Sequence, residues 1–152
     1  MLFKMHLAFG FLIGLAAIKA FSPQNTLIFT LIVLAGSVLP DIDHPKSRIG
    51  KKIKIIGFLF EHRGFFHSLL FLALISLVLT MFFRDNHFVL PLIIGYSSHL
   101  FLDCFNHKGI MPFYPFSRIR ARGFIKTGSL TETILFVFLI ITDALLLLNI
   151  YG

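Results

Sequence analysis

The chain has 152 residues, of which 57% are hydrophobic and 14% are charged, and its formal net charge is +7. Soluble domains are about 45–50% apolar and about 25% charged, so this composition excludes an ordinary soluble domain and indicates a membrane protein. We therefore attribute the basic balance to membrane topology and expect no nucleic-acid partner. A single cysteine, Cys104, excludes an internal disulfide.

Five apolar segments approach the roughly 17–25 residues that a helix needs to cross a membrane. No small-residue cleavage motif follows the first, so we expect no removable signal peptide. Pro91 is tolerable in the first turn of the fourth. The expected spans are about 5–21, 26–39, 65–83, 87–105 and 130–150. The sequence predicts an all-α, polytopic membrane protein, with residues 1–152 forming a single domain.

Lysine and arginine are unequally divided between the two sides that five spans would create. Of the 14 such residues, only Lys19 and Arg84 fall on the side opposite the N-terminus. The positive-inside rule then predicts an inner-membrane protein with a cytoplasmic N-terminus and an external C-terminus. The basic stretch 46–60 is typical of an interfacial helix lying on anionic lipid.

The histidines and acidic residues gather on the same predicted side, although only lysine and arginine were used to assign the topology. Only His87, Asp85 and Asp143 fall on the other side. Neutral imidazoles and carboxylates are the ligands of Zn²⁺, Mn²⁺ and Fe²⁺ in proteins. The cytoplasmic candidates are His6, Asp41, Asp43, His44, His62, His67, His99, Asp103 and Glu132.

His99 and Asp103 are four residues apart, so both project from one face of the fourth expected helix. His107 continues that register if the helix lasts so far. A charged aspartate at membrane depth is costly and is usually paired or functional. An interhelical hydrogen bond is the structural alternative to metal binding for this pair.

Two further spacings predict convergence on one site. Asp41 and Asp43 flank Ile42 beside Pro40, and an extended backbone there would aim both carboxylates the same way. His67 enters the third expected helix just after Gly64. Each residue taken alone could be an interfacial polar residue or part of a loop that ends a helix. Such independent placement would not put ligand-type residues of four segments at the same depth in the membrane.

The chain resembles the YdjM-like family in motifs that follow the family's order: LPDIDHPKS, HRGFFHS, GYSSHLFLD, a glycine followed by PFS, and GSLTE. These are LexA-regulated inner-membrane proteins of bacteria and archaea, described as metal-dependent hydrolases by inference. The resemblance extends from His6 to Glu132. Two positions depart from it, because Phe66 replaces a common threonine and Asn106-His107 replaces a Thr-Pro-like pair. His107 is therefore a poor candidate for an essential ligand.

The resemblance implies a hydrolase that uses a divalent metal ion at the cytoplasmic leaflet. Zinc is the first candidate and manganese or iron the alternative, with one or two ions. For catalysis we expect Glu132, Arg63 and His62, with Glu132 acting either as general base or as a support for a metal ligand. The expected metal ligands are His6, Asp41, Asp43, His44, His67, His99 and Asp103.

The expected partners are membrane lipids, among them a phospholipid or lipid-linked phosphoester as substrate. Arginine suits phosphate oxygens through paired hydrogen bonds, and Arg63 and the group Arg118, Arg120 and Arg122 lie on the predicted side. Two alternatives stay open. A metal or proton transporter would need a polar track toward Asp143, and a structural membrane protein would use the polar residues only to tie helices together.

Overall fold

The computed structural model describes residues 1–43, 63–83 and 86–152, and this part of the chain is helical, with no β-strand. Two isolated β-bridges lie in the loop that joins the last two helices. The all-α prediction is confirmed. In chain order the elements are α1 (Phe3–Phe21), α2 (Thr26–Val38), η1 (Leu39–Asp43), η3 (Phe65–His67), α4 (Leu69–Phe82), α5 (Asn86–Cys104) and α6 (Leu130–Tyr151).

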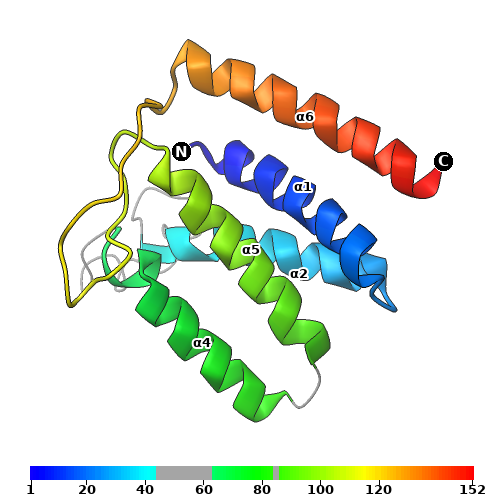
Figure 1. Cartoon of the computed structure of the whole chain (residues 1–152), viewed down its shortest axis with the longest axis horizontal. Helices are drawn as coiled ribbons and strands as arrows, with labels where there is room; N and C mark the ends of the chain where they lie inside the picture. The colour runs from blue at the N-terminus through cyan, green and yellow to red at the C-terminus, as the bar shows by residue number, and fades with distance from the viewer. Residues whose placement is uncertain (44–62, 84–85) are drawn as a thin grey trace.

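Helix α1 is central, since it packs against α2, α5 and α6, while α4 packs mainly against α5 (Figure 1). The start of α1, the end of α5 and the start of α6 lie at one end of the molecule. The loop between α5 and α6 covers that end, and η1 and η3 approach it from below in this view. Among the described residues, His6, Asp41, His67, His99 and Asp103 are thereby brought near one another.

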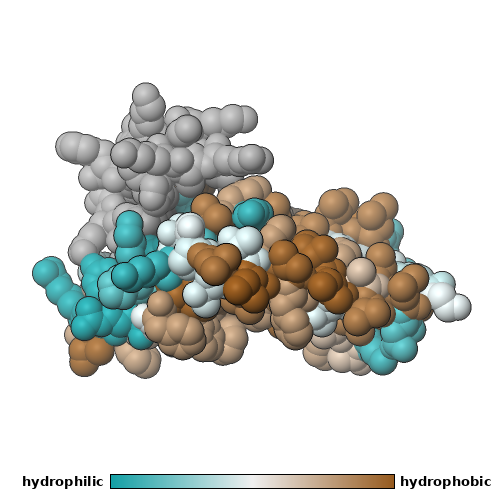
Figure 2. Space-filling view, turned by 90° about the horizontal axis from the view of Figure 1, so that it is seen from above, coloured by the Kyte–Doolittle hydropathy of each residue, from teal (hydrophilic) through white to brown (hydrophobic). Residues whose placement is uncertain are grey.

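Three helices in the described part of the chain are long and apolar enough to cross a membrane: Phe3–Phe21, His87–Cys104 and Leu130–Tyr151. The apolar helices α2 and α4 are shorter. Large hydrophobic side chains are widely exposed along the helices. On the face drawn in Figure 2, hydrophobic residues (brown) cover the middle, and hydrophilic residues (teal) lie toward the ends. Pro91 lies inside α5, beyond the first turn where we expected it.

The third expected helix starts later than predicted, at Leu69 instead of residue 65. Ser68 has an extended backbone (φ −106°, ψ 153°), and its hydroxyl accepts a hydrogen bond from the Phe71 amide at 3.1 Å. Serine at this N-cap position satisfies an amide that has no partner inside the helix. His67 consequently belongs to the separate short helix η3 and is not carried by α4.

The expected extended backbone at Asp41 and Asp43 is wrong, because η1 continues directly from α2. The Leu39 amide bonds to the carbonyls of Ala35 and Gly36, so the chain keeps winding. Pro40 fits because a first helical turn does not need the amide hydrogen that proline lacks. Asp41 therefore approaches the polar end from a helical turn. The side chain of Asp43, and all of His44 and His62, lie outside the described residues.

Glycine allows α2 and α5 to approach each other closely. A Cβ atom on Gly95 would lie 2.0 Å from the carbonyl oxygen of Val33, and one on Gly36 would lie 2.7 Å from that of Leu92. Neither position can hold a side chain without moving backbone, which is how small residues act at helix contacts in membranes. This contact brings the last turn of α2 alongside the second half of α5.

Candidate metal centre

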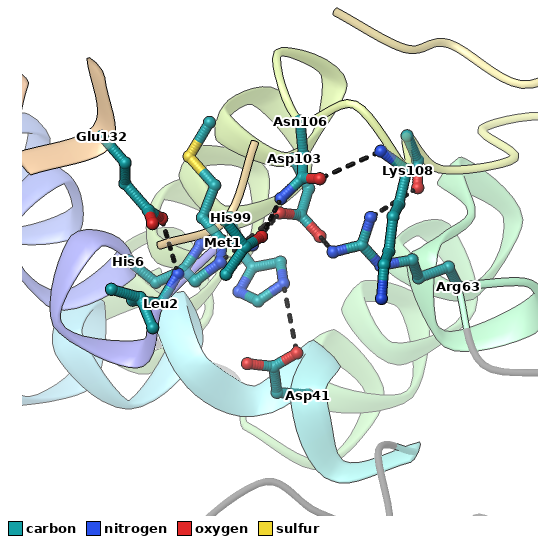
Figure 3. A network of polar contacts seen from close by, with 12 residues as sticks. Met1, Leu2, His6, Asp41, Arg63, His99, Asp103, Asn106, Lys108 and Glu132 are labelled. Atoms are coloured by element: carbon teal, nitrogen blue, oxygen red, sulfur yellow. Dashed lines mark hydrogen bonds and ion pairs between the residues drawn. The ribbon is translucent and has the colours of Figure 1, made fainter. Parts of the chain in front are cut away.

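Five ligand-type side chains from four elements meet where the helix ends converge (Figure 3). His6 comes from α1, Asp41 from η1, His67 from η3, and His99 and Asp103 from α5. The three histidines and Asp103 are each at most 1% exposed. Because burying so many polar groups is costly without compensating bonds, their convergence calls for a binding partner or a complete hydrogen-bond network.

The five residues form two overlapping triads. One is His6, His99 and Asp103, and the other is Asp41, His67 and His99. Within each triad, one ligand atom of every residue lies within 4.8 Å of the others. His99 belongs to both, so the two triads are neighbouring parts of one site.

The ring of His99 is oriented by the backbone of α2. Its Nδ1 lies 2.7 Å from the carbonyl oxygen of Ser37, which can only accept, so Nδ1 carries the proton and Nε2 presents a lone pair. This Nε2 lies 3.3 Å from Nε2 of His67 and 3.9 Å from Oδ1 of Asp41. Metal-binding histidines are commonly held through the other ring nitrogen in this way.

The separation of the two Nε2 atoms suits a common metal ion. Two nitrogens bound at about 2.0–2.1 Å by one tetrahedral Zn²⁺ lie about 3.3–3.4 Å apart. The observed 3.3 Å between His67 and His99 matches that separation. An N–H···N hydrogen bond between the rings is the alternative that this geometry also allows.

His6 adds a second observation that fits a metal. Its ring stacks on His99, with centroids 3.8 Å apart and planes 12° apart. Within the described residues neither ring nitrogen has a hydrogen-bond partner, although Nε2 lies 3.5 Å from Oδ1 of Asp103. Buried polar atoms are rarely left in this state, so the donor set fits a divalent ion.

Asp103 is the point where the positive groups meet. Its Oδ1 accepts a hydrogen bond from the amino group of Met1 at 2.8 Å, and its Oδ2 lies 3.2 Å from Nη2 of Arg63 and 3.9 Å from Nε2 of His67. Nη1 of Arg63 donates to the carbonyl of Gly109 at 3.0 Å. Arg63, which we predicted as a catalytic residue, is thus buried against Asp103 and tied to the loop after α5 (Figure 3).

Glu132 lies beside the triads but is engaged by backbone. Its Oε1 accepts from the Leu2 amide at 2.8 Å, and its Oε2 accepts from the Gly128 amide at 2.6 Å. Ser129 caps the same helix by accepting from the Glu132 amide at 3.3 Å. The carboxylate therefore joins the start of α1 to the start of α6. Its role as a general base stays a prediction.

Glu132→Gln is expected to separate these two roles. The amide side chain keeps one acceptor and turns an N–H₂ group toward a backbone N–H, so we expect a loss of about 1–3 kcal/mol in the free energy of unfolding. Metal content should stay at the wild-type level, since Glu132 is in neither triad. Thermal unfolding and metal analysis of the purified variant check this. Wild-type stability would show that the two hydrogen bonds from backbone amides to Glu132 contribute nothing to the fold.

The profile of the family described as "YdjM inner membrane protein" matches residues 1–151. The chain belongs to this family. The family resemblance seen in the motifs is confirmed, and with the apolar helices it identifies an inner-membrane protein.

Two curated relatives are similar in sequence to part of the chain. The "Uncharacterized protein YvsG" of Bacillus subtilis (strain 168) is 37% identical over 102 residues, which cover 64% of each protein. The "Inner membrane protein YdjM" of Escherichia coli (strain K12) is 36% identical over 89 residues, which cover 51% of this chain and 44% of that protein. The match thus spans less than two thirds of either relative. No solved structure matches the chain.

Several residues outside the expected ligand set lie away from the triads. His107 follows the end of α5 and is exposed, as is His87. Asp143 is buried on α6, outside both triads. Three loop arginines are exposed: Arg118, Arg120 and Arg122.

Sequence reasoning missed two contributors to the site. The Ser37 carbonyl that orients His99 is a backbone group and has no signature in the sequence. Asn106, which is 1% exposed, donates to the Thr127 hydroxyl at 3.0 Å and accepts from the Lys108 amide at 3.0 Å. Asn106 joins two parts of the loop after α5, and the sequence marked it only as a departure from the family pattern.

Proposed function

We propose that this protein is a metal-dependent hydrolase of the inner membrane that acts on a phosphate-containing lipid at the cytoplasmic leaflet. The observation that carries the proposal is the pair of facing imidazoles, His67 and His99, with His99 held by the Ser37 carbonyl. The stacked His6, whose ring nitrogens lack hydrogen-bond partners within the described residues, and the two flanking carboxylates support it.

The two triads would hold one or two divalent ions, with zinc the first candidate because imidazole and carboxylate are its ligands. Such an ion supplies Lewis acidity and lowers the pKa of a bound water. The protein's own contribution is to keep His99 Nε2 unprotonated and to keep bulk water away from the ligands. Arg63 holds Asp103 in place through the ion pair at 3.2 Å.

The cytoplasmic location and the multi-pass topology are supported by the distribution of charge. The triads lie at the same end as the loop that carries Arg118, Arg120 and Arg122, and positive residues favour the cytoplasmic side. The same arginines are exposed and suit the phosphate of a lipid headgroup.

A transport function is less well supported. A pathway from the triads toward Asp143 would need polar side chains along it. The groove that contains Asp143 is lined mostly by apolar side chains, among them Leu7, Phe11 and Ile140. Its other polar residue is Lys4, and no triad residue lines it. This mostly apolar lining does not favour a polar route to Asp143.

The proposal is tested by metal analysis of the detergent-purified protein, followed by hydrolysis assays with phosphatidic acid and phosphatidylglycerol in mixed micelles. We expect about one or two zinc ions per chain, and phosphate-ester cleavage that a chelator stops and zinc restores. No retained metal, together with a melting temperature that a chelator leaves unchanged, would contradict the proposal and favour a structural role for the polar cluster.

A further inference from the structure

An apolar groove lies next to the triads on the side of α1 that faces α5 and α6. Its volume is about 290 Å³. All the side chains that line it are hydrophobic: Phe9, Phe101, Leu102, Phe105, Phe124, Ile125, Leu135 and Leu139. We call it the proximal groove. The side chains that line this groove cannot form hydrogen bonds with a polar ligand, so the groove suits a hydrocarbon chain.

The helix arrangement explains why the groove exists. Helix α1 packs against both α5 and α6, and those two helices make few contacts with each other. In Figure 1, α1 lies between them. The proximal groove is therefore lined by α1, α5 and α6, with Phe124 and Ile125 of the loop at one end. In an inner-membrane protein its open side meets lipid.

The groove continues along the seam between α1 and α5. A second hollow of about 440 Å³, the distal groove, is lined by Ile13, Ile93 and Ile94 with two serines. Phe9 and Phe101 line both grooves and stack on each other at 6.0 Å. At about 1.5 Å per residue, α5 rises about 18 Å from the distal to the proximal end. That is close to half of the roughly 30 Å hydrocarbon core.

The inner end of the proximal groove is one layer of side chains from the metal centre. Leu102 and Leu139 line the groove and also pack with Met5, and this cluster is buried. Leu102 is followed in the chain by Asp103, and Met5 is followed by His6. A chain lying in the groove would thus place its polar end beside the triads.

Two exposed cations are close in sequence to the loop residues at one end of the groove. Phe124 is 77% exposed at the groove's end, and the exposed cations Arg122 and Lys126 lie two residues to either side of it. Cations at this level attract an anionic headgroup by about 1 kcal/mol each. The apolar groove and the cations together match the two parts of an anionic lipid.

We propose that the two grooves hold one acyl chain of an anionic phospholipid, with its phosphate between the loop cations and the triads. This rests on the proposed hydrolase function and specifies its substrate class as a lipid bound through its chain from within the bilayer. A lipid bound in this way enters sideways from the membrane, so the reacting ester need not leave the leaflet.

The chain contains no tryptophan, so one introduced tryptophan is a clean reporter of lipid occupancy. Phe101→Trp places it between the two grooves, and Phe138→Trp is the matched control. Phe101 is 56% exposed and Phe138 62% exposed, but Phe138 lines neither groove. Both proteins are placed in phosphatidylcholine nanodiscs containing increasing fractions of phosphatidic acid brominated on its acyl chains, which quenches nearby tryptophan.

Quenching at position 101 is expected to reach half its maximum at a brominated-lipid fraction at least fivefold lower than at position 138. Equal fractions at the two positions overturn the groove proposal. Phe9→Trp, which reports from the opposite wall, gives the same comparison if Phe101→Trp fails to fold. Metal is measured in the same samples. Bound metal with equal quenching rejects only the groove, whereas preferential quenching without metal rejects the hydrolase.

Discussion

Replacing His99 with alanine is expected to abolish metal binding at both triads. His99 is the one residue that the two triads share, and its Nε2 faces His67 on one side and Asp41 on the other. Loss of a partner that only orients a ligand typically costs 10–100-fold in metal affinity, so loss of the ligand itself should cost more than about 100-fold. Metal analysis of purified His99→Ala should therefore find less than a tenth of the wild-type content.

The single-triad variants give the comparison that interprets this result. His6→Ala should remove only the ion of its own triad and His67→Ala only the other, if two ions are bound. With one shared ion, both variants should lose it. His107→Ala is the matched control, because His107 is exposed beyond the end of α5 and should leave metal content unchanged. Wild-type metal content in His99→Ala would show that the ligand assignment is wrong.

The sequence was most informative where one helix carries two polar residues at a fixed spacing. His99 and Asp103 share a face of α5, as the interval of four residues requires, and both are buried in the cluster. The apolar segments also predicted the positions of α1, α5 and α6 to within a few residues. Such features depend on helical periodicity and length, which a single sequence specifies directly.

Local backbone geometry at the ends of helices was harder to predict. The stretch from Pro40 to Asp43 was expected to be extended, yet η1 forms because the winding of α2 continues through Leu39. His67 was expected on a long helix, and the capping of α4 by Ser68 leaves it on η3. Each outcome depends on a few competing hydrogen bonds whose free energies differ little.

The individual contacts between distant segments could not be predicted. Arg63 bonds to Gly109 and pairs with Asp103, two contacts that its place in the sequence did not indicate, while its expected role toward phosphate stays a prediction. Ser37 orients His99 only because the small residues of α2 and α5 let the helices approach closely. These relations depend on tertiary packing, and the sequence pattern indicated only that polar residues would meet at one end.

Asp103→Ala is expected to destabilise the fold as well as to remove a ligand. Asp103 and the guanidinium of Arg63 are both buried, with Oδ2 and Nη2 3.2 Å apart. Removing one partner of a buried ion pair leaves an uncompensated charge and typically costs about 3–5 kcal/mol. Thermal unfolding of the detergent-purified variant should show this loss, and metal analysis should show that the triad of His6, His99 and Asp103 no longer binds an ion.

A double variant separates these two effects. Asp103→Ala combined with Arg63→Met removes both charges of this pair and leaves only the Met1 amino group without its carboxylate. Part of the lost stability should therefore return, while metal binding does not. Asp143→Asn, a change at a buried acid outside both triads, should keep wild-type metal content. Restored metal in the double variant would exclude Asp103 as a ligand, and wild-type stability of Asp103→Ala alone would show that the pair with Arg63 contributes nothing to the fold.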